Sequence, residues 1–410
     1  MMVANISQYQ TENLFLLMGG NPLPNYIAAI SLLNPKGQAF LLHTDQTQLQ
    51  AERLRSVLSK YQSFATAFLI NIGKFQADSY AIYQAVQQVA NSLKTSVGLN
   101  YTGGTKAMSV HAYRAITDIH PNAVCSYLDA NTLEMYFDNN EQNSDRLKVL
   151  SQLSLAELFE LHGLIWRSHP LDSPILPELA AQFANYFQSF EVAREWRNWC
   201  NQELNPKTKE YGQQFWLEER ELLSLLPLSL QKLSRGWRKL LENIGAGQNR
   251  LSLKSSSKYG FNSCTSLCEW LDGIWLEHYV LDQVQQIAAK LNIQECKMSF
   301  HIDEQSSQNR RWEKFEFDVA FVRNYQLFAI SCTTSGDRKI CKQKLFEAHA
   351  RAKQLGGSEA RVGLVCCNHR PDTLREELEV QKRDRRVAVF GRQDLGDLDQ
   401  KIFNWVKQND

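Results

Sequence analysis

The sequence predicts an α/β protein that contains a doubly wound parallel sheet, a helical middle region and a second α/β segment. Short apolar runs alternate with helical patterns over residues 1–145, which is typical of a parallel sheet covered by helices. Strand signals then fade over residues 146–255, and a strand pair flanked by helices follows in residues 256–410. At 410 residues the chain is long enough for two or three domains, each with its own core.

Composition narrows the classes of function. The 45 basic and 44 acidic residues nearly cancel, so any site for a polyanion has to be a local patch. No apolar run approaches the roughly 18 residues of a membrane span, and the first residues are too polar for a signal peptide. The nine cysteines form no C-x-x-C pair, which indicates reduced, buried thiols in a cytoplasmic protein and argues against structural zinc.

The first segment alternates strands with helices. Residues 13–18 form an apolar strand that ends in a turn rich in glycine, asparagine and proline, and a helical pattern follows over residues 26–33. Further strands are expected at residues 38–42, 65–70, 97–99 and 124–127. Parallel sheets bind ligands beyond the carboxyl ends of their strands, so the loops after these strands form the expected binding edge.

The most informative loop runs from Asn100 to Lys106 (NYTGGTK), between a strand and a helix that begins near Met108. Its two glycines let the backbone turn tightly and approach a ligand. The threonines and the first helix amides would then face a phosphate or hydroxyl group, favoured by the helix dipole. The loop lacks the spacing of a Walker A motif or a dinucleotide fingerprint. A plain strand-to-helix turn with a capping threonine is the alternative interpretation.

This loop, together with GGNPLPN at residues 19–25, resembles the CRISPR-associated Rossmann fold (CARF) sensor domain. The resemblance covers residues 1–145 and implies a homodimer that encloses one cyclic oligoadenylate, with tetra-adenylate favoured over hexa-adenylate. A ligand with two-fold symmetry would meet the same loops twice. The resemblance assigns ligand contact to Asn21, Pro22, Thr44, Thr102, Gly103, Gly104, Thr105, Lys106 and Met108.

The middle region, residues 146–255, is expected to be a helical connector. Its pattern over residues 180–199 is amphipathic and carries several phenylalanines and tryptophans. Closely spaced tryptophans can stack on bases, but they more often form a core, and we favour the core interpretation. Glycine and serine clusters at residues 245–247 and 255–257 mark the expected linker.

In the third segment, Glu277 interrupts the apolar stripe of a long helix predicted over residues 267–291. A carboxylate on a buried stripe is costly unless it is paired, protonated or bound to metal; a salt bridge is the plain explanation. The strand predicted at residues 314–321 alternates with period two, so Glu316 and Asp318 share one face. Carboxylates beside a hairpin partner strand can hold Mg²⁺ or Mn²⁺.

This helix, hairpin and following basic helix resemble the restriction-endonuclease-like, PD-(D/E)xK fold. More closely, GIWLEHYV, FEFDVAFV, LFAISC and KLFEAHARAKQLGG resemble the nuclease half of CARF-containing effectors. The resemblance implies a nuclease domain over residues 256–410. It matches the metal-binding aspartate to Asp318 and a helix glutamate to Glu277. In an active site, Asp318, with Glu277 or Glu316 and a backbone carbonyl near Cys332, would hold the metal ion.

One tripeptide departs from the family pattern. The second strand usually reads Glu-Cys-Lys, which supplies a metal-binding carboxylate and a lysine that positions the attacking water. This chain has Ser331-Cys332-Thr333 instead. Lysines on the next helix, such as Lys339, Lys342 or Lys344, together with Glu316, would replace the missing groups. Otherwise the site cleaves slowly, or the domain has lost catalysis and only binds.

Three functions follow as hypotheses. The leading one is a cytoplasmic effector of type III CRISPR antiviral defence, in which cyclic oligoadenylate allosterically activates a homodimeric, metal-dependent endonuclease against DNA or RNA. The second is an inactive sensor or adaptor whose nuclease-like domain only binds nucleic acid or a partner. The third is a CARF site that degrades its own ligand, with Thr105 and Lys106 positioning a 2′-hydroxyl.

Overall fold

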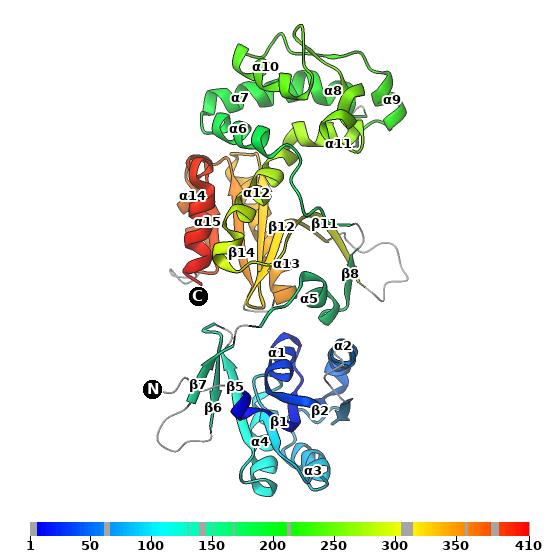
Figure 1. The fold of residues 1–410 in the computed structure, drawn as a ribbon, viewed down its shortest axis with the longest axis vertical. Helices are drawn as coiled ribbons and strands as arrows, with labels where there is room; N and C mark the ends of the chain where they lie inside the picture. Colours follow the sequence, from blue (N-terminus) through cyan, green and yellow to red (C-terminus); the bar gives the residue numbers. More distant parts are fainter. Residues whose placement is uncertain are drawn as a thin grey trace.

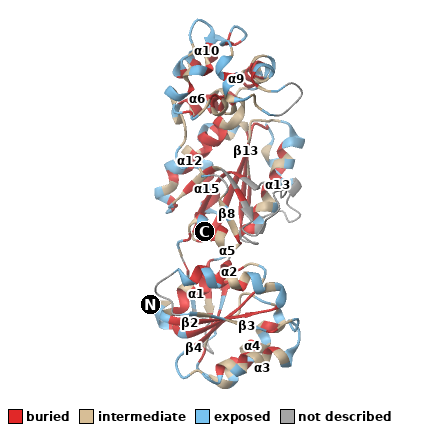
Figure 2. Ribbon diagram, turned by 90° about the vertical axis from the view of Figure 1, so that its right-hand side faces the viewer, coloured by how far each residue is buried: buried red, intermediate tan, exposed pale blue. Residues whose placement is uncertain are grey.

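The computed structural model describes residues 6–60, 66–129, 131–138, 145–149, 151–166, 169–210, 215–304, 315–356, 360–378 and 385–409. The molecule is elongated, and its units lie along one axis (Figure 1). Their spatial order differs from their order in the chain, because the C-terminal α/β unit lies between the N-terminal sheet and the helical residues. Figure 2 shows the same order from the side. The helical residues expected to connect the two α/β units therefore lie beyond the second one.

The N-terminal unit contains a seven-stranded sheet in the order β3-β2-β1-β4-β5-β6-β7. Its parallel strands are β1 (Thr11–Leu17), β2 (Leu33–His43), β3 (Thr66–Asn71), β4 (Val97–Asn100) and β5 (Val124–Asp129). The hairpin strands β6 (Glu134–Phe137) and β7 (Asp145–Lys148) extend it antiparallel. The helices are α1 (Leu23–Leu32), α2 (Gln48–Ser59), α3 (Ser79–Ala90) and α4 (Lys106–Ile119).

The predicted doubly wound, largely parallel sheet is confirmed. The helix expected over residues 26–33 begins earlier, at Leu23, because a proline is tolerated in the first turn, where backbone N–H groups have no intrahelical partner. Residue 65 of the third predicted strand lies outside the described residues. The terminal hairpin was not predicted.

The C-terminal α/β unit contains a six-stranded sheet in the order β15-β14-β13-β12-β11-β8. Its strands are β11 (Cys296–Glu304), β12 (Phe315–Arg323), β13 (Gln326–Thr333), β14 (Arg361–Cys366), β15 (Val387–Phe390) and the short edge strand β8 (Leu164–Trp166). Strands β13, β14 and β15 are parallel, whereas β8, β11, β12 and β13 pair antiparallel. The helices are α12 (Trp275–Leu291), α13 (Arg338–Gly356), α14 (Pro371–Leu378) and α15 (Leu398–Lys407).

The helical unit is held together by aromatic side chains. Its helices are α6 (Pro177–Phe187), α7 (Phe190–Trp199), α8 (Asn205–Thr208), α9 (Glu219–Ser224), α10 (Arg235–Leu241) and α11 (Cys264–Glu269), with a small hairpin of β9 (Leu228–Ser229) and β10 (Arg250–Leu251). The ring of Phe183 lies 4.8 Å from Trp196 and 4.9 Å from Trp237. These rings are buried in a cluster that continues into α12, which confirms the core interpretation and explains why the unit packs there.

The long helix expected over residues 267–291 is interrupted, so the prediction is confirmed for residues 275–291 and wrong for the part before them. Helix α11 ends at Glu269, a π-helical turn spans Trp270–Ile274, and α12 begins at Trp275. Residues five apart on an α-helix point about 140° away from each other, whereas a π-helical turn brings them onto one side. Trp270 and Trp275 both enter the same buried cluster, which accounts for the break. Gly273, the residue with non-helical backbone, is a weak helix former.

Helix α5 (Leu155–Leu161) joins the two α/β units. Its apolar side chains are buried in a cluster that also contains residues of α2 and α13. The ammonium of Lys60, after α2, pairs with the carboxylate of Glu160 on α5. The N–H of Leu155, at the first turn of α5, donates to the side chain of Glu295 just before β11. The two α/β units therefore share a packed apolar contact.

Two expectations drawn from composition can be compared with the structure. All nine cysteines are buried and unpaired, as expected for reduced thiols. None of the described helices combines the length and apolarity that crossing a lipid bilayer requires.

Candidate functional sites

Two predicted motifs meet at the carboxyl edge of the N-terminal sheet. The loop after β4 lies directly on the end of β1, since a methyl group on Gly103 would lie 2.1 Å from the carbonyl oxygen of Leu17. The loop after β1 touches the same place, because a methyl group on Gly19 would lie 3.2 Å from the amide nitrogen of Gly104. Glycine is required where backbones approach so closely. The structure therefore brings both motifs together, as the sequence predicts.

The threonines of the loop after β4 hold its shape. The hydroxyl of Thr105 caps α4 by accepting the N–H of Met108 (3.2 Å), and it donates to the carbonyl of Gln76 (2.8 Å). The hydroxyl of Thr102 accepts the N–H of Leu128 (2.7 Å). Both hydroxyls are therefore engaged within the protein, so the capping interpretation is correct for Thr105. A role in ligand contact for either one remains a prediction.

The other predicted ligand residues divide into buried and exposed groups. Thr44 is buried after β2 and its N–H donates to Thr47 (3.0 Å). Met108 is buried beneath Gly104, so its side chain supports the loop from below. Gly104 and Lys106 are exposed, and Asn21 is half-buried, whereas Pro22 is buried at the start of α1. The exposed backbone and Lys106 are thus the groups presented to a ligand.

Two buried polar residues at this edge, Asn25 and His43, were not assigned a role from the sequence. Asn25, on the first turn of α1, donates from Nδ2 to the carbonyl of Leu17 (3.0 Å), and its Oδ1 has no hydrogen-bond partner among the described residues. His43 contacts the carbonyl of Thr44 through Nδ1 (3.1 Å), and its buried Nε2 also has none. Asn25 could have been recognised from the sequence, because it is a polar residue of the GGNPLPN motif at the start of an apolar helix.

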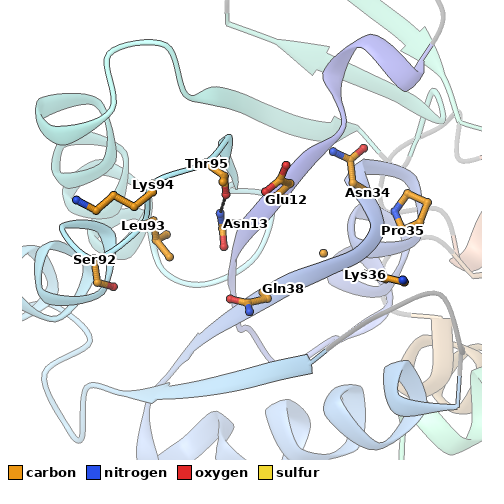
Figure 3. A pocket seen from close by; sticks show the side chains of 11 residues that line it. Glu12, Asn13, Asn34, Pro35, Lys36, Gln38, Ser92, Leu93, Lys94 and Thr95 are labelled. Carbon is orange, nitrogen blue, oxygen red and sulfur yellow. Dashed lines mark hydrogen bonds between the residues drawn. The ribbon is translucent and has the colours of Figure 1, made fainter.

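A surface pocket of about 580 Å³ lies at the opposite edge of this sheet (Figure 3). It lies between the start of β1, the first half of β2 and the segment before β4, where Asn13 donates to Thr95 (2.8 Å). None of the predicted ligand residues lines it. This pocket is therefore separate from the edge where the two motifs meet.

In the C-terminal unit, Asp318 on β12 is held by the neighbouring strand β13. Its Oδ2 accepts the hydroxyl of Ser331 (2.9 Å) and the N–H of Cys332 (2.6 Å). Asp318 is only 7% exposed. Ser331 stands where the family pattern has a glutamate, and here it orients the aspartate. The contact with Cys332 is made by its amide N–H, whereas the predicted metal ligand near this residue is a backbone carbonyl.

Glu277 lies in the first turn of α12 and is 6% exposed. Its Oε2 accepts the hydroxyl of Ser299 (2.8 Å) on β11. Ser299 adopts a left-handed backbone (φ 51°), which is uncommon for a serine and marks a local departure from regular strand geometry. A fixed hydroxyl therefore orients this carboxylate, as Ser331 orients Asp318.

The thiol of Cys332 shows which charges gather at this site. Burial raises its pKa well above the usual range, the negative charges of Asp318 and Glu277 raise it further, and the positive charge of Lys344 lowers it. The charge of Lys344, on α13, therefore acts on the same thiol as the charges of Asp318 and Glu277. Lys342 instead has its Nζ 5.8 Å above the ring of Phe346.

Two predicted site residues remain. Lys339 lies in the first turn of α13 and is exposed. The side chain of Glu316 lies outside the described part of the structure, as does the whole of Lys314 at the start of that predicted strand. Among the described residues, no group of three histidine, cysteine, aspartate or glutamate side chains gathers as a metal site. The described acidic groups of the cluster are thus Asp318 and Glu277, with Lys344 beside them.

Comparison with known families agrees with this geometry. Residues 16–158 match the model of the Card1 CARF domain, and residues 264–409 match that of the Card1-like endonuclease domain. The chain carries a CARF domain and a Card1-like endonuclease domain. The loops at Gly103 and Gly19 therefore lie in the CARF domain, and the cluster around Cys332 lies in the endonuclease domain.

Solved structures resemble the chain over most of its length. Protein VC1899 from Vibrio cholerae is 20% identical with a TM-score of 0.71, covering 97% of this chain and 98% of its own. Can2 from Sulfobacillus thermosulfidooxidans, solved with cyclic tetra-adenylate, is 16% identical with a TM-score of 0.70, covering 96% of this chain and 99% of its own.

A third structure, a type III CRISPR defence DNA nuclease activated by cyclic oligoadenylate, is 16% identical with a TM-score of 0.52. The match covers 86% of this chain and 45% of that one. At these identities the likeness establishes the fold. No protein in the curated set matches the chain.

Proposed function

We propose that this chain is a nuclease of type III CRISPR antiviral defence, activated when cyclic oligoadenylate binds its CARF domain. The observation that carries the proposal is the joining of a CARF domain to an endonuclease domain in one chain. Two similar structures support it, since one was solved with cyclic tetra-adenylate and another is a DNA nuclease activated by cyclic oligoadenylate. Tetra-adenylate is accordingly the proposed activator.

The ligand site is proposed at the loops where Gly19 approaches Gly104. Lys106 and the exposed backbone of Gly104 would contact the phosphates, because they lie at the N-terminus of α4, where the helix dipole favours an anion. Thr44, Thr102, Thr105 and Met108 would support this surface from within. In a homodimer, two copies of the loops would enclose one ligand.

Asp318 and Glu277 fit a divalent ion, because Mg²⁺ and Mn²⁺ prefer oxygen ligands and Mg²⁺ commonly binds through one or two carboxylates while keeping several waters. Both carboxylates are buried and held by hydroxyl groups. An ion bound there would supply Lewis acidity toward the scissile phosphate and lower the pKa of a water. Ser331, Ser299 and the amide of Cys332 would fix the orientation of the two carboxylates.

Lys344 is the proposed replacement for the family lysine. Its charge acts on Cys332 together with those of Asp318 and Glu277, whereas Lys342 lies over Phe346. A cation beside the carboxylates would stabilise the negative charge that develops on phosphate oxygens. This arrangement favours an active nuclease over the sensor without catalysis, for which the loss of the Glu-Cys-Lys pattern at Ser331 and Thr333 is the supporting observation.

The decisive experiment combines purified protein and Mg²⁺ or Mn²⁺ with labelled single-stranded RNA, single-stranded DNA and supercoiled plasmid. Each substrate is tested with and without cyclic tetra- or hexa-adenylate, beside the variant Asp318→Asn. We expect ligand-dependent cleavage by the wild type and none by the variant, with unchanged ligand affinity.

The other outcomes select the other functions. Ligand binding without cleavage of any substrate would indicate a sensor or adaptor. Loss of intact ligand over time, in wild type and Asp318→Asn alike, would indicate a CARF domain that degrades its own activator.

A further inference from the structure

Two arginines whose guanidinium groups make no hydrogen bond or ion pair with the described residues lie at the carboxyl ends of β13, β14 and β15. Arg392 follows β15, and Arg197 comes from α7, in the helical unit that lies against the endonuclease domain (Figure 1). In a sheet with parallel strands, this edge is where ligands bind. The loops beneath are firmly tied, since Cys367 N–H donates to Ser335 (3.1 Å) and Asn368 Nδ2 donates to Gly336 (2.8 Å).

The guanidinium of Arg392 lies above the loop that follows β13. Its Cζ is 5.1 Å from the centre of the Phe190 ring, and a methyl group on Gly336 would lie 3.4 Å from its Nη2. The same methyl group would lie 2.8 Å from the carbonyl oxygen of Cys367. Glycine is therefore required at position 336, because this loop, the carbonyl of Cys367 and the guanidinium of Arg392 lie so close together.

Arg197 faces the same region. Burial lowers its pKa and the neighbouring thiol of Cys367 opposes this shift, whereas the positive charge of Arg392 lowers the pKa, as expected for two cations that repel each other. Arg197 Nη2 and Arg392 Nε are both buried without a hydrogen-bond partner. Among the described residues, neither guanidinium donates a hydrogen bond or pairs with a carboxylate. Two such cations together are unfavourable unless an anion lies between them.

The position of these two arginines indicates which kind of anion they would bind. Ser335 and Gly336 follow directly on the end of β13, the strand whose Ser331 and Cys332 hold Asp318. Arginine binds phosphate through parallel N–H bonds, and phosphate contacts position a nucleic acid without reading its sequence. A nucleic-acid strand cleaved at Asp318 would continue along this edge of the β-sheet.

We propose that Arg197 and Arg392 form a phosphate subsite, which holds a backbone phosphate of the nucleic-acid strand beside the one cleaved. This inference rests on the proposed nuclease function, because it takes the substrate of the same site. It assigns to the helical unit a direct part in substrate binding, since Arg197 is supplied by α7.

Binding to nucleic acid tests the subsite without requiring cleavage. Arg197→Gln and Arg392→Gln are made in full-length Asp318→Asn protein, and the affinity for a fluorescent single-stranded oligonucleotide is measured by anisotropy across a salt series in EDTA. Arg194→Gln is the matched control, because Arg194 is exposed on the same helix and lies 5.6 Å from the same Phe190 ring. It removes an equal charge outside the subsite.

We expect each subsite variant to weaken binding about tenfold to a hundredfold, as for the loss of a charged hydrogen bond. The slope of log affinity against log salt should fall by about one per lost phosphate contact. The control should stay within about twofold of its parent. Melting temperature separates the subsite from a structural role, because removing one of two repelling cations should leave it equal or higher.

Two results would overturn the subsite: oligonucleotide affinities of Arg197→Gln and Arg392→Gln that match the control, or melting temperatures well below that of the parent. Failure of the nuclease function is distinguishable. A wild-type protein that cleaves nothing, while its affinity still depends on both arginines, refutes nuclease activity and supports the subsite. A wild-type protein that cleaves, with variants that bind as well as the control, refutes the subsite alone.

Discussion

Gly103→Ala tests whether the loop after β4 is the ligand site. The added methyl group would lie 2.1 Å from the carbonyl oxygen of Leu17, whereas such contacts are essentially never shorter than 3.0 Å. The loop or the end of β1 must therefore shift by about 0.9 Å, the difference between these two distances. The same carbonyl accepts the buried hydrogen bond of Asn25. We expect a loss of about 2 to 4 kcal/mol in the free energy of unfolding.

The ligand affinity should fall more visibly than the stability. A shift of this size removes contacts with charged phosphates, each worth about 1.5 to 3 kcal/mol, or roughly tenfold to 150-fold in affinity. Calorimetric titration with cyclic tetra-adenylate measures the affinity, and urea unfolding measures the stability.

Gly20→Ala is the control for stability, because its methyl group would have no atom within 4 Å. A Gly103→Ala protein that binds the ligand as tightly as wild type would refute the placement of the site.

Three further predictions concern the endonuclease domain and its helical unit. Lys344→Ala should lower ligand-activated cleavage at least about tenfold, whereas Lys342→Ala should retain most of it. Equal losses of cleavage in the two variants would contradict the catalytic role proposed for Lys344. Burial lowers the pKa of His278 to about 4, and its Nδ1 accepts the N–H of Ile175 (3.0 Å). Below about pH 6.5 His278 is protonated in the unfolded chain, whereas in the folded protein it stays neutral down to about pH 4. The free energy of unfolding should therefore fall by about 1.4 kcal/mol per pH unit between these two values. The urea midpoints measured at pH 7 and pH 5 should differ less in His278→Leu than in the wild type. Phe183→Ala should cost about 3 to 5 kcal/mol by leaving a cavity among the tryptophans, and a melting temperature like that of wild type would argue against it.

Local patterns explain how much of the fold was predictable. The alternation of strands and helices in the CARF domain depends on residues close together in the chain, so the sheet and its binding edge could be predicted. The break before α12 could not, because it arises where Trp270 and Trp275 both pack into one core. For the same reason the place of the helical unit beyond the endonuclease sheet was not apparent from chain order.

The candidate sites show the same division. The convergence of Asp318 and Glu277 was predicted from the resemblance to a known fold, and both are found around Cys332. The orienting roles of Ser331 and Ser299 were not predicted, because each depends on the register of neighbouring strands. The pair of Arg197 and Arg392 comes from distant parts of the chain and leaves no local pattern.

Helix α5 limits how this protein can be recombined. Since its apolar side chains pack against both α2 of the CARF domain and α13 of the endonuclease domain, it serves as a shared adaptor that fits two surfaces at once. A chimera that exchanges the sensor alone would place foreign side chains against one half of this adaptor. Sensor swaps in this architecture therefore need to carry α2 and α5 together, with compensating changes on α13, which favours inheritance of the two domains as one piece.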